Sequence, residues 1–126
     1  MIHFVETKKA PVAAGHYSQA TVFNNMIFVA GQLPIDPVSG KKNLGSIESQ
    51  TLQALENVKA IVEAGGGNLN SILKTTIYIP NVSLWDKVNH IYAQFFGDHK
   101  PARAVVPSRD LHYGFLIEIE AIAAVV

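Results

Sequence analysis

Apolar residues follow two different spacings along the chain, and these spacings separate strands from helices. Short runs rich in β-branched and aromatic residues predict strands. These runs are residues 2–6, 17–23, 26–30, 72–79, 102–106 and 115–126. Apolar residues recur at helical spacing in two longer segments, one after Ser46 and one after Ser83. The predicted order is therefore a strand, a hairpin, a helix, a strand, a helix and two strands.

Turn and capping residues mark the boundaries of the hairpin and the first helix. Asn24 and Asn25 are adjacent and both tolerate a positive φ, so they predict a tight hairpin turn. Ser46 is the expected N-cap of the first helix. The run Gly65–Gly67 should end that helix, because glycine adopts the left-handed conformation of a helix cap without strain.

The second helix has its own boundary signals. Ser83 is the expected N-cap, with Asp86 three residues later in a position like that of a capping box. The apolar stripe ends at Phe96, and Gly97 should close the helix. The two predicted helices are thus separated by a single predicted strand.

This order of elements predicts a single α+β domain over residues 1–126. Strands separated by helices need crossover connections, which produce a mixed sheet with parallel pairs. Two helices are too few to cover both faces of a sheet of about six strands, so both should pack on one face. The last strand keeps one continuously apolar face, while its other face, which carries Glu118 and Glu120, is still half apolar. An uncovered face of this kind favours association with another subunit.

The composition supports hidden apolar surface and excludes several function classes. Apolar residues make up 48% of the chain and charged residues only 16%, which is low for a globular domain. Ten basic residues balance ten acidic ones, so no electrostatic argument favours nucleic acid or an anionic membrane as a partner. There is no cysteine, which excludes disulfides and thiolate chemistry. No signal-peptide pattern or apolar run long enough to span a bilayer is visible, so a cytoplasmic protein is expected.

The candidate chemistry lies in the last quarter of the chain. Glu118 and Glu120 point to the same side of their strand, about 6.5–7 Å apart at Cα. One of them is an acid/base group in a semi-buried pocket, or both are carboxylates at a wet sheet edge; the spacing alone favours the second interpretation. Arg103, one of two arginines, lies among alanines and valines. It either binds a carboxylate ligand or forms a structural ion pair with Glu118 or Glu120 on a neighbouring strand.

Two further residues carry weaker signals. Asn89 lies near the apolar stripe of the second helix, where it either orients a ligand or simply borders the stripe. Tyr17 follows a glycine loop and either walls a pocket or packs in the core. The five histidines have no spacing typical of a metal site, so no metal is expected.

Taken together, the segments resemble the RidA family, also called YjgF/YER057c/UK114. The segments that carry the resemblance are residues 14–20, 28–34, 53–66, 74–79, 88–92, 95–96, 101–103 and 114–123. They occur in order at matching spacing over nearly the whole chain. The resemblance implies a chorismate-mutase-like α+β fold and a homotrimer with pockets between subunits.

The resemblance also implies an activity that needs no cofactor. This activity is the hydrolysis of reactive 2-enamines and 2-imines, such as 2-aminoacrylate and 2-iminopropanoate, to 2-keto acids and ammonia. Arg103 matches the arginine that binds the substrate carboxylate, and Glu118 the glutamate that places or activates water. Tyr17 matches the pocket tyrosine, Gly31 the strand end whose backbone faces the ligand, and Asn89 the helix asparagine.

Three departures from the family pattern concern the shape of the pocket and the substrate preference. Ala104 replaces a small hydroxyl residue after the arginine, Ala30 replaces a serine, and His112 stands where a proline is frequent. The rival hypothesis is a non-catalytic trimeric regulatory protein that binds a 2-keto acid or a similar small carboxylate in the same pocket.

Overall fold

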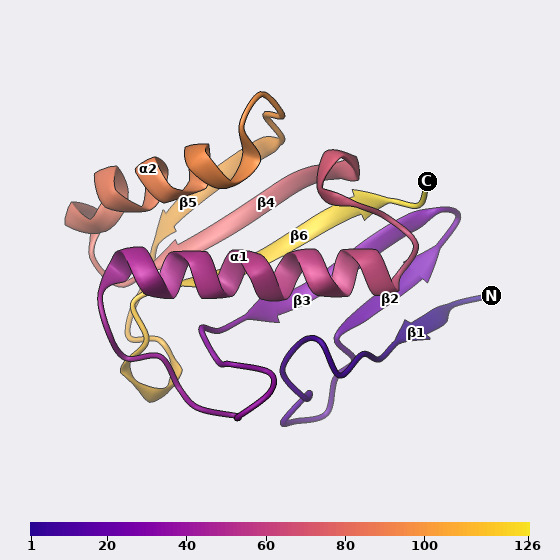
Figure 1. Ribbon diagram of the computed structural model, residues 1–126, viewed down its shortest axis with the longest axis horizontal. Helices are drawn as coiled ribbons and strands as arrows, with labels where there is room; N and C mark the ends of the chain where they lie inside the picture. Colours follow the sequence, from indigo (N-terminus) through magenta and orange to yellow (C-terminus); the bar gives the residue numbers. More distant parts are fainter.

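The computed structural model describes residues 1–126 and contains one six-stranded sheet and two α-helices (Figure 1). The strands are β1 (His3–Val5), β2 (Ala20–Phe23), β3 (Met26–Gln32), β4 (Ile72–Ile79), β5 (Ala102–Pro107) and β6 (Glu118–Ala124). The helices are α1 (Ile47–Ala64) and α2 (Trp85–Phe96). The strand order across the sheet is β1-β2-β3-β6-β4-β5. Only β4 and β5 pair in parallel, and α2 forms the crossover between them.

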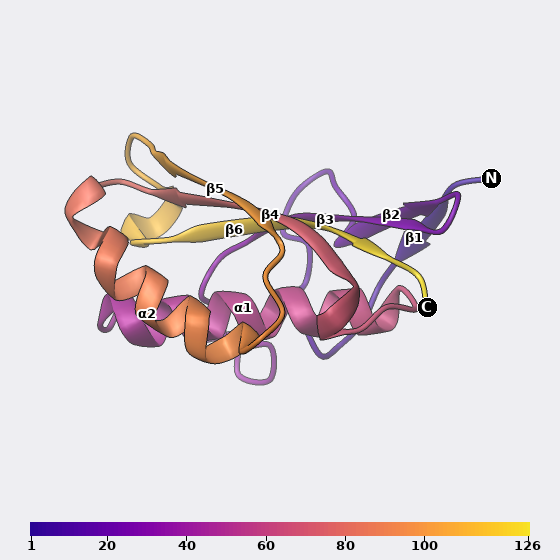
Figure 2. The same cartoon turned by 90° about the horizontal axis from the view of Figure 1, so that it is seen from above.

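Both helices lie on one face of the sheet, which confirms the predicted α+β architecture (Figure 2). Alternate residues of β6 explain this arrangement. Ile119, Ala121 and Ala123 are buried, and they belong to the same apolar cluster as Leu55 and Ile61 of α1. Burying each large aliphatic side chain contributes about 1.5–3 kcal/mol, so the cluster holds the helix layer on the sheet. Neither helix is long and apolar enough to cross a membrane.

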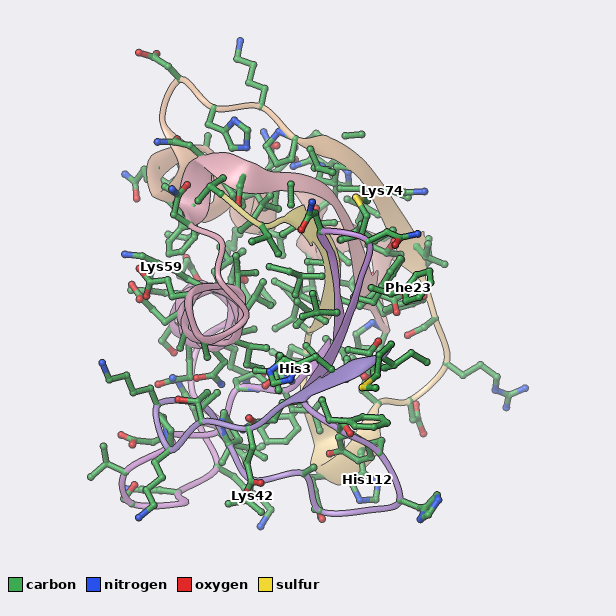
Figure 3. The ribbon with its side chains drawn as sticks, turned by 90° about the vertical axis from the view of Figure 1, so that its right-hand side faces the viewer. His3, Phe23, Lys42, Lys59, Lys74 and His112 are labelled. Carbon is green, nitrogen blue, oxygen red and sulfur yellow. The ribbon has the colours of Figure 1, made fainter.

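The other face of the sheet is uncovered within the chain. Figure 3 shows Phe23 and Lys74 on this side and Lys59 on the helix side. The exposed large apolar side chains of the strands include Phe4, Phe23, Phe28 and Val106, which lie on the uncovered face. Apolar side chains gathered on one face of a sheet are typical of a protein–protein contact.

The predicted boundaries of the hairpin and of α1 are confirmed. Asn24 and Asn25 have φ values of 50° and 60°, as a type I′ turn requires. The Ser46 side chain accepts a hydrogen bond from the Ser49 N–H at 3.1 Å. Within the glycine run it is Gly66, at φ 100°, that takes the left-handed conformation.

The predicted N-cap of α2 is wrong. A 3₁₀ turn, Val82–Leu84, precedes α2, and the Asn81 side chain accepts the Ser83 N–H at 2.9 Å. Asn81 therefore caps the first turn, whereas Ser83 lies inside it. The asparagine side chain wins because it reaches the N–H two residues later in the same way that a backbone turn does. Gly97 ends α2 with φ 62°, as expected.

Two strands are shorter than predicted. The strand predicted at 17–23 begins at Ala20, because residues before it form a turn in which the Tyr17 N–H bonds to the Gly15 carbonyl. The last strand begins at Glu118 rather than at 115, because the Leu116 N–H donates to Gln50 of α1 at 2.9 Å. A strand boundary thus depends on a helix side chain far away in the sequence.

Candidate functional site

Arg103 of β5 points toward the helix layer and is held there by α2. Its Nη1 donates a hydrogen bond to Oδ1 of Asn89 at 2.9 Å. Its guanidinium carbon lies 4.7 Å from the ring centre of Tyr92 and 5.4 Å from that of Trp85. Cation–π contacts of this kind fix the plane of the guanidinium while leaving its other N–H donors for a ligand.

Arg103, Asn89 and Tyr92 border a hollow between α2 and β5, which we call the Arg103 cavity. Its volume is about 380 Å³. Its lining residues are Asn89, Tyr92, Ala93, Phe96, Gly97, His99, Lys100, Pro101 and Arg103. A guanidinium at the wall of such a cavity suits two-point binding of a carboxylate.

Glu118 lies on the opposite, uncovered face of the sheet. It pairs directly with Tyr78 of β4, and its carboxylate lies over the backbone of Gly31 at the end of β3. A Cβ at position 31 would overlap Oε2 of Glu118 and lie 3.0 Å from its Cδ. Glycine at position 31 is therefore what allows the carboxylate to occupy this place.

The surroundings of Glu118 raise the pKa of its carboxyl group. Partial burial contributes most, and the negative charge of Glu120 adds to it, while His112 acts in the opposite direction. Glu120 itself accepts a hydrogen bond from the Tyr78 hydroxyl at 2.5 Å, and this bond also raises the pKa of Tyr78. The two glutamates therefore differ: Glu120 is held by a tyrosine, and Glu118 is the one adjacent to Gly31.

Tyr17 lies near Gly31 and has an exposed ring. Its hydroxyl oxygen accepts the Ala14 N–H at 3.2 Å, which ties the ring to its own loop. Tyr17 and Gly31 share a hollow of about 410 Å³, which we call the Gly31 cavity. Its lining residues are Pro11, Val12, Ala14, Gly15, Tyr17, Gly31, Gln32, Leu33, Ile35, Lys42, His112 and Tyr113. A larger hollow of about 650 Å³ beside β1 includes Tyr17 but no other predicted site residue.

Within one chain, Arg103 and Glu118 do not come together. β4 lies between β5 and β6, and its Thr75 pairs with Arg103 on one side. Thr75 is buried and bonds to Tyr92 of α2 at 2.8 Å, so this row of the sheet faces the helices. Tyr78, which pairs with Glu118, belongs to the opposite face. The alternative prediction of a structural ion pair between Arg103 and Glu118 or Glu120 is therefore wrong, because the guanidinium bonds to Asn89 instead.

The predicted site residues thus form two half-sites. Arg103 and Asn89 lie at the α2–β5 edge, and Tyr17, Gly31 and Glu118 lie at the end of β3 and β6. Sequence reasoning missed Tyr92 and Tyr78, because tyrosines within an apolar stripe or strand give no signal of their partners. No group of three or more histidine, aspartate or glutamate side chains is arranged to hold a metal ion.

Comparisons with known proteins give one consistent result. A family model described as endoribonuclease L-PSP matches residues 7–125. The chain is 47% identical over 123 residues to a RutC family protein of Pyrococcus horikoshii, with 98% of both chains covered. It is 39% identical over 119 residues to the human 2-iminobutanoate/2-iminopropanoate deaminase, covering 94% of this chain and 87% of the human protein.

A solved structure agrees with these relatives. The crystal structure of E. coli TdcF with bound serine superposes with a TM-score of 0.93 at 36% identity. The superposition covers 98% of this chain and 99% of the other. The similarity therefore extends over the whole fold.

Proposed function

The chain belongs to the endoribonuclease L-PSP family, also called the RidA family, and from this premise we propose that it hydrolyses reactive 2-enamines and 2-imines. The products are a 2-keto acid and ammonia, and 2-iminopropanoate is the simplest substrate of this class. Relatives at about 40% identity carry the names of such deaminases. A cytoplasmic location is part of the proposal.

The observation that carries the proposal is the way in which α2 holds the Arg103 guanidinium at the wall of a cavity. A guanidinium packed between Asn89 and two aromatic rings at a cavity wall binds a small carboxylate without having to titrate. The substrate carboxylate would lie on its remaining donors. This anchoring places the imine carbon at a defined position, and positioning is the main requirement for an already electrophilic carbon.

Glu118 is the proposed group that places and activates the attacking water. Water adds to the imine carbon while Glu118 accepts one of its protons and passes it to the nitrogen, which gives a carbinolamine. Glu118 then takes the proton of the carbinolamine hydroxyl and passes it to the nitrogen, and the C–N bond breaks to release the 2-keto acid and ammonia. The raised pKa of Glu118 suits this role, because a base with a pKa closer to neutrality both accepts and returns a proton readily. Tyr17 and the Gly31 backbone would line the same side of the substrate.

A homotrimer is part of the proposal because the half-sites lie on opposite faces of one sheet. A neighbouring subunit that covers the exposed face can bring its own Arg103 to Glu118. The exposed apolar side chains Phe4, Phe23, Phe28 and Val106 give this face the character of a subunit contact.

The test is the release of 2-keto acid by a serine or threonine dehydratase with and without the protein. The protein should accelerate this release, and Arg103→Ala should lower kcat/KM by about ten- to a hundredfold, as the loss of a charged hydrogen bond implies. Arg109→Ala is the matched control, because Arg109 is the only other arginine and is exposed. Full acceleration by Arg103→Ala would refute the mechanism.

The second candidate is a non-catalytic trimeric protein that binds a small carboxylate for regulation. The crystal structure of E. coli TdcF contains bound serine, a small molecule with a carboxylate, and this supports the second candidate. Under this hypothesis calorimetry would detect Arg103-dependent binding of a 2-keto acid while the dehydratase assay shows no acceleration. Nucleic acid as the ligand is not favoured, since the chain has a formal net charge of zero.

A further inference from the structure

The Gly31 cavity has an outer wall that takes no part in the proposed reaction. This wall consists of Lys42, His112 and Tyr113, and Figure 3 shows Lys42 and His112 at the same end of the molecule. The Lys42 ammonium lies 4.6 Å from the centre of the Tyr113 ring. The His112 and Tyr113 ring centres are 3.8 Å apart. Two loops distant in the sequence therefore meet through the contact between Lys42 and Tyr113.

The position of the Tyr113 ring is determined by the fold. Tyr113 has φ 59° and ψ 12°, a left-handed conformation that residues other than glycine adopt rarely. The ring meets the edge of Phe115 at 5.9 Å, and Phe115 is fully buried. Because Phe115 is fixed in the core, its contact with the Tyr113 ring keeps that ring in place against the Lys42 ammonium.

The wall carries positive charge that no carboxylate of the chain neutralises by direct contact. The Lys42 side chain packs over an aromatic face, which leaves its three N–H donors available to a ligand. The His112 ring supplies a further polar edge and lies close enough to Glu118 to lower the pKa of that carboxyl group. The Glu118 carboxylate lies beside Gly31, which lines one side of the cavity, and the Lys42 ammonium group lines the other.

The cavity is also larger than a small imino acid needs. Its volume of about 410 Å³ lies in the range of sites for drug-sized ligands. A substrate with a methyl side chain would leave most of the space between Gly31 and Lys42 empty. The geometry has room for a longer side chain that ends at Lys42.

We propose that Lys42 and Tyr113 form a subsite for a second carboxylate, so that the preferred substrates are 2-imino acids with an acidic side chain. This inference rests on the proposed function. Arg103 of a neighbouring subunit would bind the α-carboxylate, and Lys42 would bind the carboxylate of the side chain. The Tyr113 ring would hold the Lys42 ammonium in place for this charge-assisted hydrogen bond.

The experiment compares kcat/KM for two imines formed in the assay by amino-acid oxidases. One is the dicarboxylic imine from aspartate or glutamate, and the other is the aliphatic imine from 2-aminobutanoate. In the wild-type protein the ratio of dicarboxylic to aliphatic kcat/KM should exceed one. Lys42→Glu should lower this ratio by about tenfold or more, and Lys42→Gln by less, because it removes the charge without reversing it.

Lys41→Glu is the matched control, because it makes the same charge change one residue away and Lys41 does not line the cavity. Its ratio should stay within about twofold of the wild type. An unchanged ratio in Lys42→Glu, or an equal fall in Lys41→Glu, would overturn the subsite. A higher kcat/KM for an aromatic imine than for the dicarboxylic one would overturn it as well. If the wild type accelerates neither imine, the proposed function itself fails.

Discussion

At the scale of single residues, Glu118 and Glu120 have the same chemistry and the same strand face but different surroundings. Glu120 accepts the Tyr78 hydroxyl, and its charge raises the pKa of Glu118. In the proposed mechanism the pair would therefore work as a base and a neighbouring charge. Glu118, which lies against Gly31, is the proposed base.

Replacing Glu120 should shift the pH dependence of the reaction. Glu120→Gln removes a negative charge that disfavours the ionised form of Glu118, so the pKa of Glu118 should fall. A base with a lower pKa stays ionised at lower pH, and the acidic limb of kcat/KM should move to lower pH. The measurement is the pH profile of kcat/KM for an aliphatic imine, with coupling enzyme in excess at every pH.

Glu56→Gln provides the control for this shift. Glu56 is exposed on α1, in the helix layer that covers the opposite face of the sheet, so the same charge change occurs away from Glu118. Its pH profile should match that of the wild type. If the acidic limb of the kcat/KM profile stays in place or moves to higher pH in Glu120→Gln, then Glu120 does not raise the pKa of Glu118.

At the scale of elements, α2 is the support of the Arg103 half-site. It supplies Asn89 and both aromatic rings that hold the guanidinium. The turn that begins α2 depends on Asn81 rather than on the serine that the sequence pattern favours. The start of this helix is therefore a local determinant of the site.

Asn81→Ala should destabilise the protein by about 1 kcal/mol, the usual effect of losing a capping side chain. Ser83→Ala should change the free energy of unfolding by less than about 0.5 kcal/mol, because Ser83 is exposed and its backbone N–H still has the Asn81 partner. Urea unfolding of the two variants under identical conditions makes the comparison. Equal losses in both variants would contradict the capping role of Asn81.

At the scale of the whole molecule, the separation of the half-sites means that the proposed activity would require the assembled trimer. Coexpressed Arg103→Ala and Glu118→Ala chains should regain activity, because some interfaces then combine the native Arg103 of one chain with the native Glu118 of another. Random mixing in a trimer predicts about a quarter of the wild-type rate. Each variant expressed alone should retain no more than about a tenth of the wild-type rate.

The measurement is the dehydratase-coupled rate of the purified mixed assembly, with its mass determined by light scattering. Two controls are the separately purified variants and a mixture made without subunit exchange. If the mixed assembly is no more active than the single variants, Arg103 and Glu118 of different chains do not combine in one site, and the prediction fails. A monomer with full activity would exclude the intersubunit site altogether.

The sequence by itself determined the order of the elements and most of their boundaries. The Asn24–Asn25 turn, the Ser46 cap and the end of α2 at Gly97 all follow from interactions among a few consecutive residues. The alternation along β6 likewise indicated which face is buried, because the period of a strand is a local property. The resemblance of the segments supplied the family, and the comparisons confirmed it.

Only the tertiary structure decided where the candidate chemistry lies. The insertion of β4 between β5 and β6 separates Arg103 from Glu118, and the register places them on opposite faces. The close fit of Glu118 to Gly31 and the stacking of Lys42 on Tyr113 join residues far apart in the chain. Strand order and register depend on pairings between distant segments, and no local pattern of residues specifies them.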